Sequence, residues 1–364
     1  MKATAENLKN EIQEEALSKV LPYHRVGVAM SMGIGKTLLA LKHMDYNYCK
    51  GMKFLVVAPK LSIFKTWEDE ANKFGLQHLL PYIQFSTYKS LLKQSIDYNI
   101  IYLDECHNLL ETHRPYLETY KGRILGLTGT RPRYDKSEKG RMVEQFCPIK
   151  YEYKIDDAVD AEILNDYRII VHRMDLSTDN TLRVETKGRV FYTSERASYD
   201  YWTGRLASAI SAREVQMMRI MRMKAIMTFP TKEQYIPKLL ETIKDKVIIF
   251  ANTKSQADKL CEFSYHSGNS KSEGNLELFK NDSILRLSCV LQLSEGVNIP
   301  NLKEGIVMHS YSNERKLSQR FGRGLRLKIG EQFTLHVLCY RNTVDETWVK
   351  QSLEDLDPSK ITYI

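Results

Sequence analysis

The sequence predicts an α/β protein with two parallel-sheet domains. Three observations support this prediction. Short apolar segments alternate with helix-like segments in both halves of the chain, a glycine-rich loop joins the first strand to the next helix, and the 364 residues are enough for two domains that each bury a core. Near-continuous apolar strands bounded by helices are typical of parallel sheets covered on both faces.

The first half of the chain is expected to contain five strands. A helix at Thr37–Met44 follows the first of them, as a βαβ succession requires. The expected strands are His24–Met30, Lys53–Ala58, Ile83–Ser86, Tyr98–Leu103 and Arg123–Leu127.

A second alternating region begins after residue 245. Between the two regions the pattern changes, and Thr181–Tyr235 contains a hairpin at Leu182–Thr193 followed by helix-like sequence rich in Met and Arg. We therefore predict a first domain over 1–155, a second over 156–364, and an accessory insertion at about 181–235. The strands expected in the second domain are Lys246–Phe250, Ser283–Leu291, Glu304–Met308 and Phe333–Cys339.

Composition narrows the class of protein. Hydrophobic residues make up 43% and charged residues 27%, as in a globular protein. No apolar run approaches the ~18 residues of a membrane span, and the polar start MKATAENLKNEIQEE is not a secretory signal, so we expect a cytoplasmic protein without membrane contact, in a bacterial host if it is phage-encoded. The net charge of +8 is compatible with a phosphate-backbone partner and equally with a solvated surface.

The segment Met30–Thr37, MSMGIGKT, lies between a predicted strand and a predicted helix. Glycines let backbone N–H groups close around phosphates, Lys36 can reach the β/γ oxygens, and the Thr37 hydroxyl can bind Mg²⁺. Met30 replaces the first glycine of the usual pattern. The residues expected to bind nucleotide in this loop are Met32, Gly33, Ile34, Gly35, Lys36, Thr37 and Leu38.

Two further motifs follow apolar strands. LDECH places Asp104 where a carboxylate can hold Mg²⁺ and Glu105 where one can polarise the attacking water. His107 is expected to couple the state of the nucleotide to the interface between the domains. The next strand ends in LTGT, which contains Thr128 and Thr130.

In this order the motifs resemble those of the superfamily 2 DEAD/DEAH-box ATPases, and most closely the Snf-type and phage branch-migration (UvsW-like) members. The resemblance covers nearly the whole chain, because KVIIFANTKSQADKL is similar to motif IV, LSEGVNIP to motif V and QRFGRGLR to motif VI. It implies two RecA-like domains that share one ATP site, with ATP and Mg²⁺ as cofactors.

The resemblance also implies further nucleotide contacts. In motif VI, Gln319, Arg323 and Arg326 act on the nucleotide, and the two arginines reach the γ-phosphate from the second domain. Gly296 and Asn298 of motif V contact nucleotide as well. Gln13 stands 23 residues before Lys36 and is either an adenine contact or a solvent-exposed helical glutamine.

The nucleic-acid strand is expected to cross both domains through phosphate contacts. Each residue that the resemblance assigns to this track is equally compatible with an ordinary loop position. These residues are Pro59 and Lys60 of motif Ia, Thr87 and Tyr88 of motif Ib, Thr128 and Thr130 of motif III, and Asn252 and Thr253 after motif IV.

The insertion contains two basic segments. Arg183–Arg189 is either a basic wedge for a DNA junction or a solvated turn at Lys187–Gly188. Arg213–Lys224 mixes Arg with Met, and a methionine stripe at helical spacing is expected to pack in a core while the arginines face the duplex.

The function these observations favour is an ATP-dependent DNA helicase or translocase that acts on forked or branched DNA in replication, recombination or repair. We expect it to be a monomer that binds forked, branched or single-stranded DNA. An ATP-dependent RNA helicase is the alternative within the enzyme class, although TGT replaces the SAT usual in DEAD-box RNA helicases. A non-catalytic nucleic-acid-binding module is the alternative outside it, and the intact GKT, DE and GRxxR argue against that.

Overall fold

The computed structural model describes residues 5–31, 33–129, 131–132, 137–186, 188–290, 299–310 and 330–364. The chain divides into two compact units, Met1–Asn165 and Asp166–Ile364, which we describe separately. None of the described helices is long and apolar enough to cross a membrane.

The first unit contains a six-stranded parallel sheet with the strand order β3-β2-β4-β5-β1-β6. Its strands are β1 (Arg25–Met30), β2 (Phe54–Ala58), β3 (Ile83–Thr87), β4 (Ile100–Leu103), β5 (Arg123–Thr128) and β6 (Ile149–Tyr153). Its helices are α1 (Ala5–Val20), α2 (Lys36–Asn47), α3 (Ser62–Lys73), α4 (Arg114–Thr119), α5 (Glu138–Phe146) and α6 (Ile155–Asp160), with short 3₁₀ turns η1 (Gln77–Tyr82), η2 (Tyr88–Lys93), η3 (Cys106–Asn108) and η4 (Glu111–His113).

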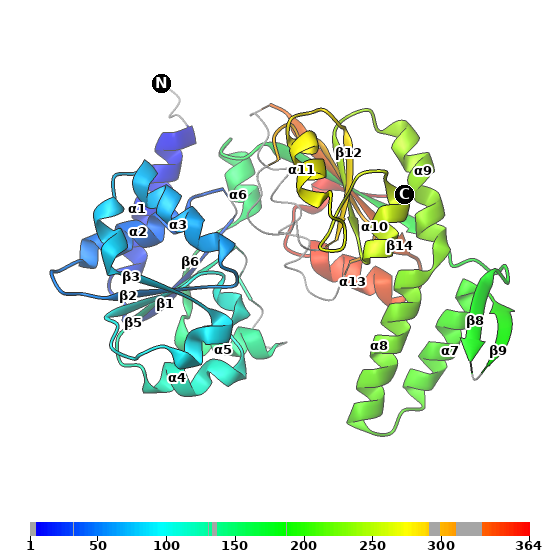
Figure 1. Cartoon of the computed structure of the whole chain (residues 1–364), viewed down its shortest axis with the longest axis horizontal. Helices are drawn as coiled ribbons and strands as arrows, with labels where there is room; N and C mark the ends of the chain where they lie inside the picture. The colour runs from blue at the N-terminus through cyan, green and yellow to red at the C-terminus, as the bar shows by residue number, and fades with distance from the viewer. Residues whose placement is uncertain are drawn as a thin grey trace. The chain divides into compact units, whose positions relative to one another are not determined.

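This sheet confirms the predicted fold class of the first half. Every residue of β2 and β4 is buried, as expected for strands covered on both faces. Figure 1 shows α1, α2 and α3 over one face of the sheet and α4 and α5 over the other. Because β4, β5 and β1 are neighbours and all strands are parallel, the segments that follow these three strands meet at one edge of the sheet.

The chain passes from the first unit to the second after Asn165, about ten residues later than the boundary predicted at 155. Helix α6 and the turn that follows it belong to the first unit because Ile163 and Leu164 are buried there. Leu164 lies directly over the glycine loop, where a Cβ added to Gly33 would meet the Leu164 Cδ2 at 3.2 Å.

The second unit contains a seven-stranded parallel sheet with the order β11-β12-β10-β13-β14-β7-β15. Its strands are β7 (Asp166–Met174), β10 (Val247–Ala251), β11 (Ser264–Tyr265), β12 (Arg286–Val290), β13 (Glu304–Val307), β14 (Gln332–Tyr340) and β15 (Ile361–Tyr363). Its helices are α9 (Pro230–Thr242), α10 (Lys254–Leu260), α11 (Ser272–Lys280) and α13 (Val344–Leu353), with a 3₁₀ turn η6 (Pro358–Lys360). The four strands expected here are all present, whereas β7, β11 and β15 were not predicted.

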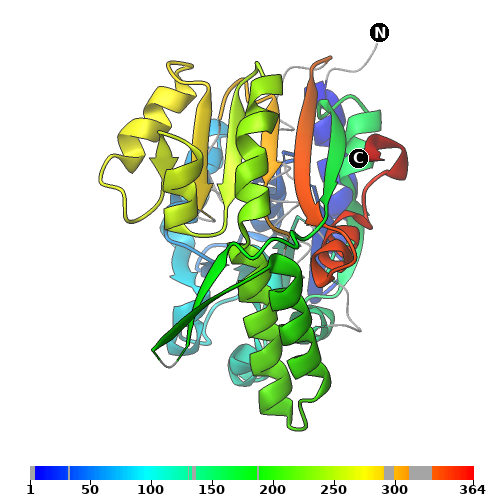
Figure 2. The ribbon, with the colours of Figure 1, turned by 90° about the vertical axis from the view of Figure 1, so that its right-hand side faces the viewer.

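The predicted insertion forms an arm, which we define as residues 182–228. It consists of an antiparallel hairpin, β8 (Leu182–Thr186) with β9 (Arg189–Thr193), and two helices, α7 (Glu195–Ala207) and α8 (Ala212–Thr228). Figures 1 and 2 both show the arm extending beyond the sheet of the second unit. Its base is held by an apolar cluster that includes Tyr199, Ile226, Phe229 and Tyr340.

The expectation that the methionines of α8 pack in a core is wrong. Only Ile226 and Met227, at the end of the helix, are buried, and the Met217 side chain is 51% exposed. The reason is that α8 packs along α7 alone for most of its length, so one face of the helix is covered and the other is not.

Candidate nucleotide and nucleic-acid site

The glycine loop between β1 and α2 has the backbone of a phosphate-binding loop. Gly33 and Gly35 have φ angles of 87° and 91°, in the left-handed region that side chains rarely adopt. Gly35 also lies against Gln13, because a Cβ at Gly35 would be 2.3 Å from the Gln13 Nε2. The conformation therefore favours glycine at position 35, and a side chain there would also have to displace the end of the Gln13 side chain.

Gln13 lies beside this loop and not in solvent. Its side chain, on α1, is 3% exposed, and its Nε2 donates a hydrogen bond of 2.8 Å to the Ile34 carbonyl. The Gln13 Oε1 and the Ser31 Oγ are buried and have no hydrogen-bond partner within the described residues. Buried polar atoms are nearly always paired, so two unpaired ones beside a glycine loop fit a site that receives a polar ligand.

Lys36 begins α2, and its Nζ donates to the Met30 carbonyl at 3.1 Å. The ammonium group is therefore held at the end of β1, from which it can exchange a carbonyl for a phosphate oxygen. Thr37 is half-buried in the same helical turn. Ile34 and Leu38 are buried, so their side chains fix the loop to the core and only their backbone faces a ligand. Met32 lies outside the described residues.

Asp104 follows β4 and is buried near Lys36. Its Oδ2 accepts a hydrogen bond of 2.9 Å from the Trp67 Nε1, and its backbone N–H donates to Val57. Burial raises the pKa of Asp104, while the Trp67 hydrogen bond and the Lys36 charge act to lower it. Trp67, on α3, was not predicted from sequence, because an isolated tryptophan in a helix gives no sign of the carboxylate it supports.

Glu105 and His107 connect the DECH segment to the end of β5. The His107 Nδ1 lies 3.0 Å from the Thr128 Oγ1 and 3.3 Å from the Glu105 Oε2. Glu105 has a φ of 49°, a conformation that a non-glycine residue keeps only where its surroundings hold it. The structure thus brings together Glu105, which is expected to polarise the attacking water, His107, which is expected to couple the nucleotide state to the domain interface, and Thr128 of motif III.

The predicted nucleic-acid contacts of the first unit follow β2 and β3. Pro59 is half-buried, Lys60 is exposed, and Thr87 ends β3. Tyr88 was expected at the nucleic-acid surface, but its side chain is only 6% exposed and its hydroxyl donates to the Asp104 carbonyl at 2.8 Å. The tyrosine therefore points inward, because its ring packs in the core and its hydroxyl is used at the acid pair.

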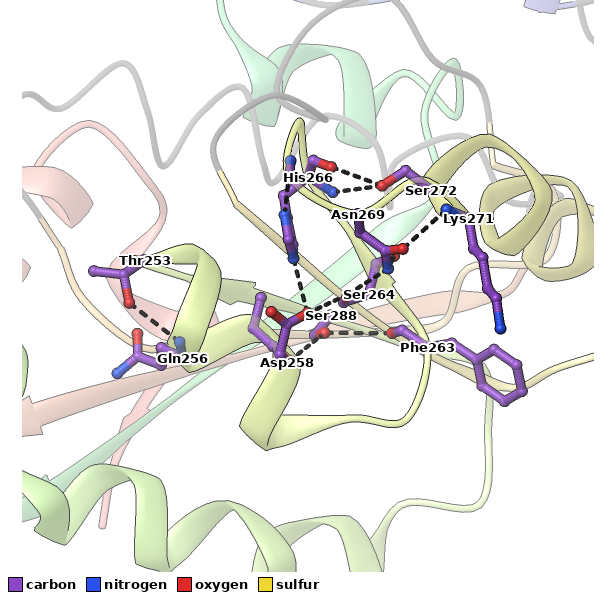
Figure 3. A network of polar contacts seen from close by, with 12 residues as sticks. Thr253, Gln256, Asp258, Phe263, Ser264, His266, Asn269, Lys271, Ser272 and Ser288 are labelled. Atoms are coloured by element: carbon purple, nitrogen blue, oxygen red, sulfur yellow. Dashed lines mark hydrogen bonds and ion pairs between the residues drawn. The ribbon is translucent and has the colours of Figure 1, made fainter.

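In the second unit, Asn252 and Thr253 lie between β10 and α10. The Thr253 hydroxyl accepts a hydrogen bond of 3.1 Å from the Gln256 N–H and so caps α10, as Figure 3 shows. Figure 3 also shows Asp258 accepting hydrogen bonds from Ser264 and His266, which tie α10 to β11 and the loop that follows it. Both predicted residues thus stand at the start of a well-anchored helix.

The other predicted site residues lie outside the described residues. They are Thr130 of motif III, Gly296 and Asn298 of motif V, and Gln319, Arg323 and Arg326 of motif VI.

The described side chains can perform three parts of nucleotide hydrolysis at one edge of the first sheet. The glycine loop and Lys36 can bind phosphates, Thr37 and Asp104 can hold a magnesium ion, and Glu105 can polarise a water. When bound, Mg²⁺ would neutralise the phosphate charge and ATP would supply the leaving group. The geometry of the loop and its unpaired buried atoms fit that ligand.

Two protein families match the chain, one in each unit. Residues 6–89 match the family described as type III restriction enzyme, res subunit, and residues 231–328 match the helicase conserved C-terminal domain.

Relatives and a solved structure show the same likeness over most of the chain. A "DNA 3'-5' translocase XPB2" of Sulfurisphaera tokodaii is 22% identical over 92% of this chain and 82% of its own length. A SWI/SNF-related regulator of chromatin, subfamily A-like protein 1, of Xenopus laevis is 21% identical, and the chain covers 43% of it. The DNA-bound type ISP restriction-modification enzyme LlaBIII shares the fold with a TM-score of 0.61 at 14% identity, over 98% of this chain and 31% of that one. Together, the family matches and relatives support a superfamily 2 helicase or translocase, a class that uses ATP.

Proposed function

We propose that this chain is an ATP-driven DNA translocase or helicase that acts on forked or branched DNA. One observation carries the proposal. Three neighbouring strands of the first sheet end in the glycine loop with Lys36, in the acid pair Asp104 and Glu105, and in Thr128, which is bonded to His107. This arrangement couples a phosphate site to a water-polarising carboxylate. The DNA translocase named among the relatives favours DNA over RNA as the partner.

In this proposal Gln319, Arg323 and Arg326 keep the roles that the resemblance gives them, and Mg²⁺ and ATP are the cofactors. The protein acts as a monomer on DNA replication, recombination or repair intermediates of the branch-migration kind.

The arm supports the choice of branched DNA. Residues 182–228 contain nine Lys or Arg and four Asp or Glu, an excess of five positive charges in a chain whose total is +8. Exposed aromatic side chains lie in the same arm, with Tyr192 63% exposed and Tyr201 59% exposed. Basic groups that track phosphates and aromatic rings that stack on unpaired bases are the two means by which proteins bind unpaired nucleic acid. An extension with both properties suits the boundary between duplex and single strand.

The test is ATP hydrolysis by the purified protein with no nucleic acid, single-stranded DNA, linear duplex, forked DNA, a four-way junction or RNA. We expect the strongest stimulation with forked or four-way DNA, and its loss in Lys36→Ala and Glu105→Gln. Stimulation by RNA above all DNA forms would favour the RNA helicase. Absence of hydrolysis with every nucleic acid would contradict the proposal and favour a non-catalytic nucleic-acid-binding module.

The role of the arm is tested in the same assay. Arg213→Glu combined with Arg219→Glu reverses two exposed charges on α8 and should remove the preference for branched over linear DNA. The matched control is Lys238→Glu with Lys244→Glu, which makes the same change of charge on exposed positions outside the arm. Equal effects of the two pairs would show that only overall charge matters.

A further inference from the structure

A pocket of about 410 Å³ opens on the first unit beside the predicted nucleic-acid residues. Pro59, after β2, forms one side of it, and η2 supplies Tyr88, Lys89 and Leu92. Leu110 and Asn108, which follow the DECH segment, form another side. The volume is within the range of pockets that hold small molecules, about 300–1,000 Å³.

Two residues of the pocket wall bond directly to the backbone of the catalytic acids. The Tyr88 hydroxyl donates to the Asp104 carbonyl at 2.8 Å, and the Asn108 Nδ2 donates to the Glu105 carbonyl at 3.0 Å. Tyr88 and Asn108 therefore line the pocket and at the same time bond to the acid pair. Any displacement of Tyr88 or Asn108 acts on the peptide groups that set the directions of both carboxylates.

The wall is firmly held on the pocket side. The His113 Nδ1 accepts from the Leu110 N–H at 3.0 Å, so its Nε2 carries the proton and donates to the Tyr88 carbonyl at 3.1 Å. Both Tyr88 and His113 are buried. A close-packed wall of this kind transmits a displacement instead of absorbing it.

Glu105 is the residue most sensitive to such a displacement. Its left-handed backbone, with a φ of 49°, persists only while neighbouring groups hold it, and the Asn108 side chain is one of those groups. A small change at Asn108 can therefore change the direction of the carboxylate assigned to the attacking water.

The lining of the pocket indicates its occupant. Lys89 offers a charge for a phosphate, while Leu92 and Leu110 expose apolar surface suited to a sugar or a base. Pro59 and Thr87 are predicted to contact the DNA strand; Pro59 itself lines the pocket, and Thr87 directly precedes Tyr88 in the chain. We propose that the pocket receives one nucleotide of the bound DNA strand, and that Tyr88 and Asn108 are positioning residues that couple this nucleotide to Asp104 and Glu105. This inference rests on the proposed function.

The experiment measures ATP hydrolysis against the concentration of the most stimulating DNA, which separates the maximum stimulation from the DNA concentration that gives half of it. Tyr88→Phe keeps the ring and removes the bond to Asp104. It should lower the maximum stimulation roughly three- to tenfold, the effect of one hydrogen bond, and leave the half-maximal DNA concentration unchanged. Asn108→Ala removes the side-chain donor to the Glu105 carbonyl and keeps the donor from the Asn108 backbone N–H, so it should act in the same direction but less strongly.

A variant of the pocket lining should change the half-maximal DNA concentration and leave the maximum stimulation as it is. Leu92→Glu puts a carboxylate where the nucleotide binds, so the half-maximal DNA concentration should rise at least about tenfold while the maximum is still reached. An unchanged half-maximal concentration would show that no nucleotide enters the pocket.

Tyr116→Phe is the matched control. Tyr116 is also buried in the first unit, and its hydroxyl donates to the backbone carbonyl of Ser95 at 2.6 Å, a bond that involves neither Asp104 nor Glu105. A loss of stimulation in Tyr116→Phe equal to that in Tyr88→Phe would reduce the role of Tyr88 to general stability. If no DNA stimulates hydrolysis by the wild-type protein, the proposed function is wrong. If DNA stimulates the wild type and Tyr88→Phe reaches the same maximum stimulation, only this inference is wrong.

Discussion

At the scale of single residues, the orientation of Asp104, which follows β4, depends on a side chain of helix α3. The Trp67 Nε1 donates to the Asp104 Oδ2 at 2.9 Å, and the Trp67 ring is fully buried edge-on against Tyr102. An indole N–H can only donate, so this contact favours a carboxylate at Asp104 and fixes which oxygen remains for a metal. Groups that support metal ligands in this way govern affinity for the metal.

We therefore predict that Trp67→Phe weakens the use of Mg²⁺. The ring is kept, so the packing on Tyr102 is retained while the hydrogen bond to Asp104 is lost. The Mg²⁺ concentration that gives half-maximal ATP hydrolysis should rise by roughly tenfold, at the lower end of the effect of removing such a partner. The measurement is a Mg²⁺ titration of hydrolysis at fixed ATP. An unchanged titration would mean that the indole serves packing alone.

Residues in local motifs were predictable from the sequence, and residues that act through tertiary contacts were not. Lys36, Asp104 and Glu105 could be found because each motif is read within a few positions of a strand end. Trp67 and Asn108 gave no such signal, because their partners are set by how α3 and η3 pack. Tyr88 was found but expected to face outward, since a sequence motif does not say which way a tyrosine points.

At the scale of elements, α9 and α13 are joined through a buried ion pair. The Lys232 Nζ lies 2.7 Å from the Asp345 Oδ2, and both residues are fully buried. The same ammonium donates to the carbonyls of Met308, just after β13, and Leu338, on β14, so its three protons are used. One side chain thus links two helices to the ends of two neighbouring strands.

Removing one member of this pair should be worse than removing both. Asp345→Ala leaves a buried ammonium without its counter-charge, which typically costs about 3–5 kcal/mol of the free energy of unfolding. Lys232→Met combined with Asp345→Leu replaces the pair by apolar groups of similar size and should restore only part of that loss, because the Tyr340 N–H and the carbonyls of Met308 and Leu338 each lose a partner. Denaturant unfolding of the two variants and the wild type measures the difference. A double variant as unstable as Asp345→Ala would contradict the prediction.

The success of element prediction followed the pattern of burial. Fully apolar strands such as β2, β4 and β10 were found because both faces of each are covered. Strand β7 was missed although it pairs with nine residues of β14, because its sequence DYRIIVHRM mixes charged and apolar residues. The burial of the α8 methionines was predicted wrongly for the converse reason. Apolar residues in a helix do not reveal that the helix packs against a single neighbour.

At the scale of the whole molecule, each unit buries a histidine whose neutral form is favoured. In the first unit burial, aided by Arg123, lowers the pKa of His43 to about 4. In the second unit burial, aided by His336, lowers the pKa of His172 to about 4. The Nδ1 atoms of these rings bond to the hydroxyls of Tyr102 and Tyr235, while the Nε2 of His43 lies 3.5 Å from the Asn47 Nδ2 and that of His172 lies 2.8 Å from the His336 Nδ1.

Both histidines make stability depend on pH in the same direction. In the unfolded chain a histidine takes up a proton near pH 6.5, whereas in the folded chain it does so only near pH 4. Their contribution is therefore complete above pH 6.5 and is lost as the pH falls towards 4, by about 2 kcal/mol for each group between pH 6.5 and 5. His43→Gln and His172→Gln should each flatten the fall in the free energy of unfolding over this range, measured by denaturant titration at several pH values. His78→Gln is the comparison variant, because it makes the same substitution at a half-exposed ring and not at a buried one. An equally steep slope in His43→Gln would show that other groups, and not this ring, set the acid sensitivity of the first unit.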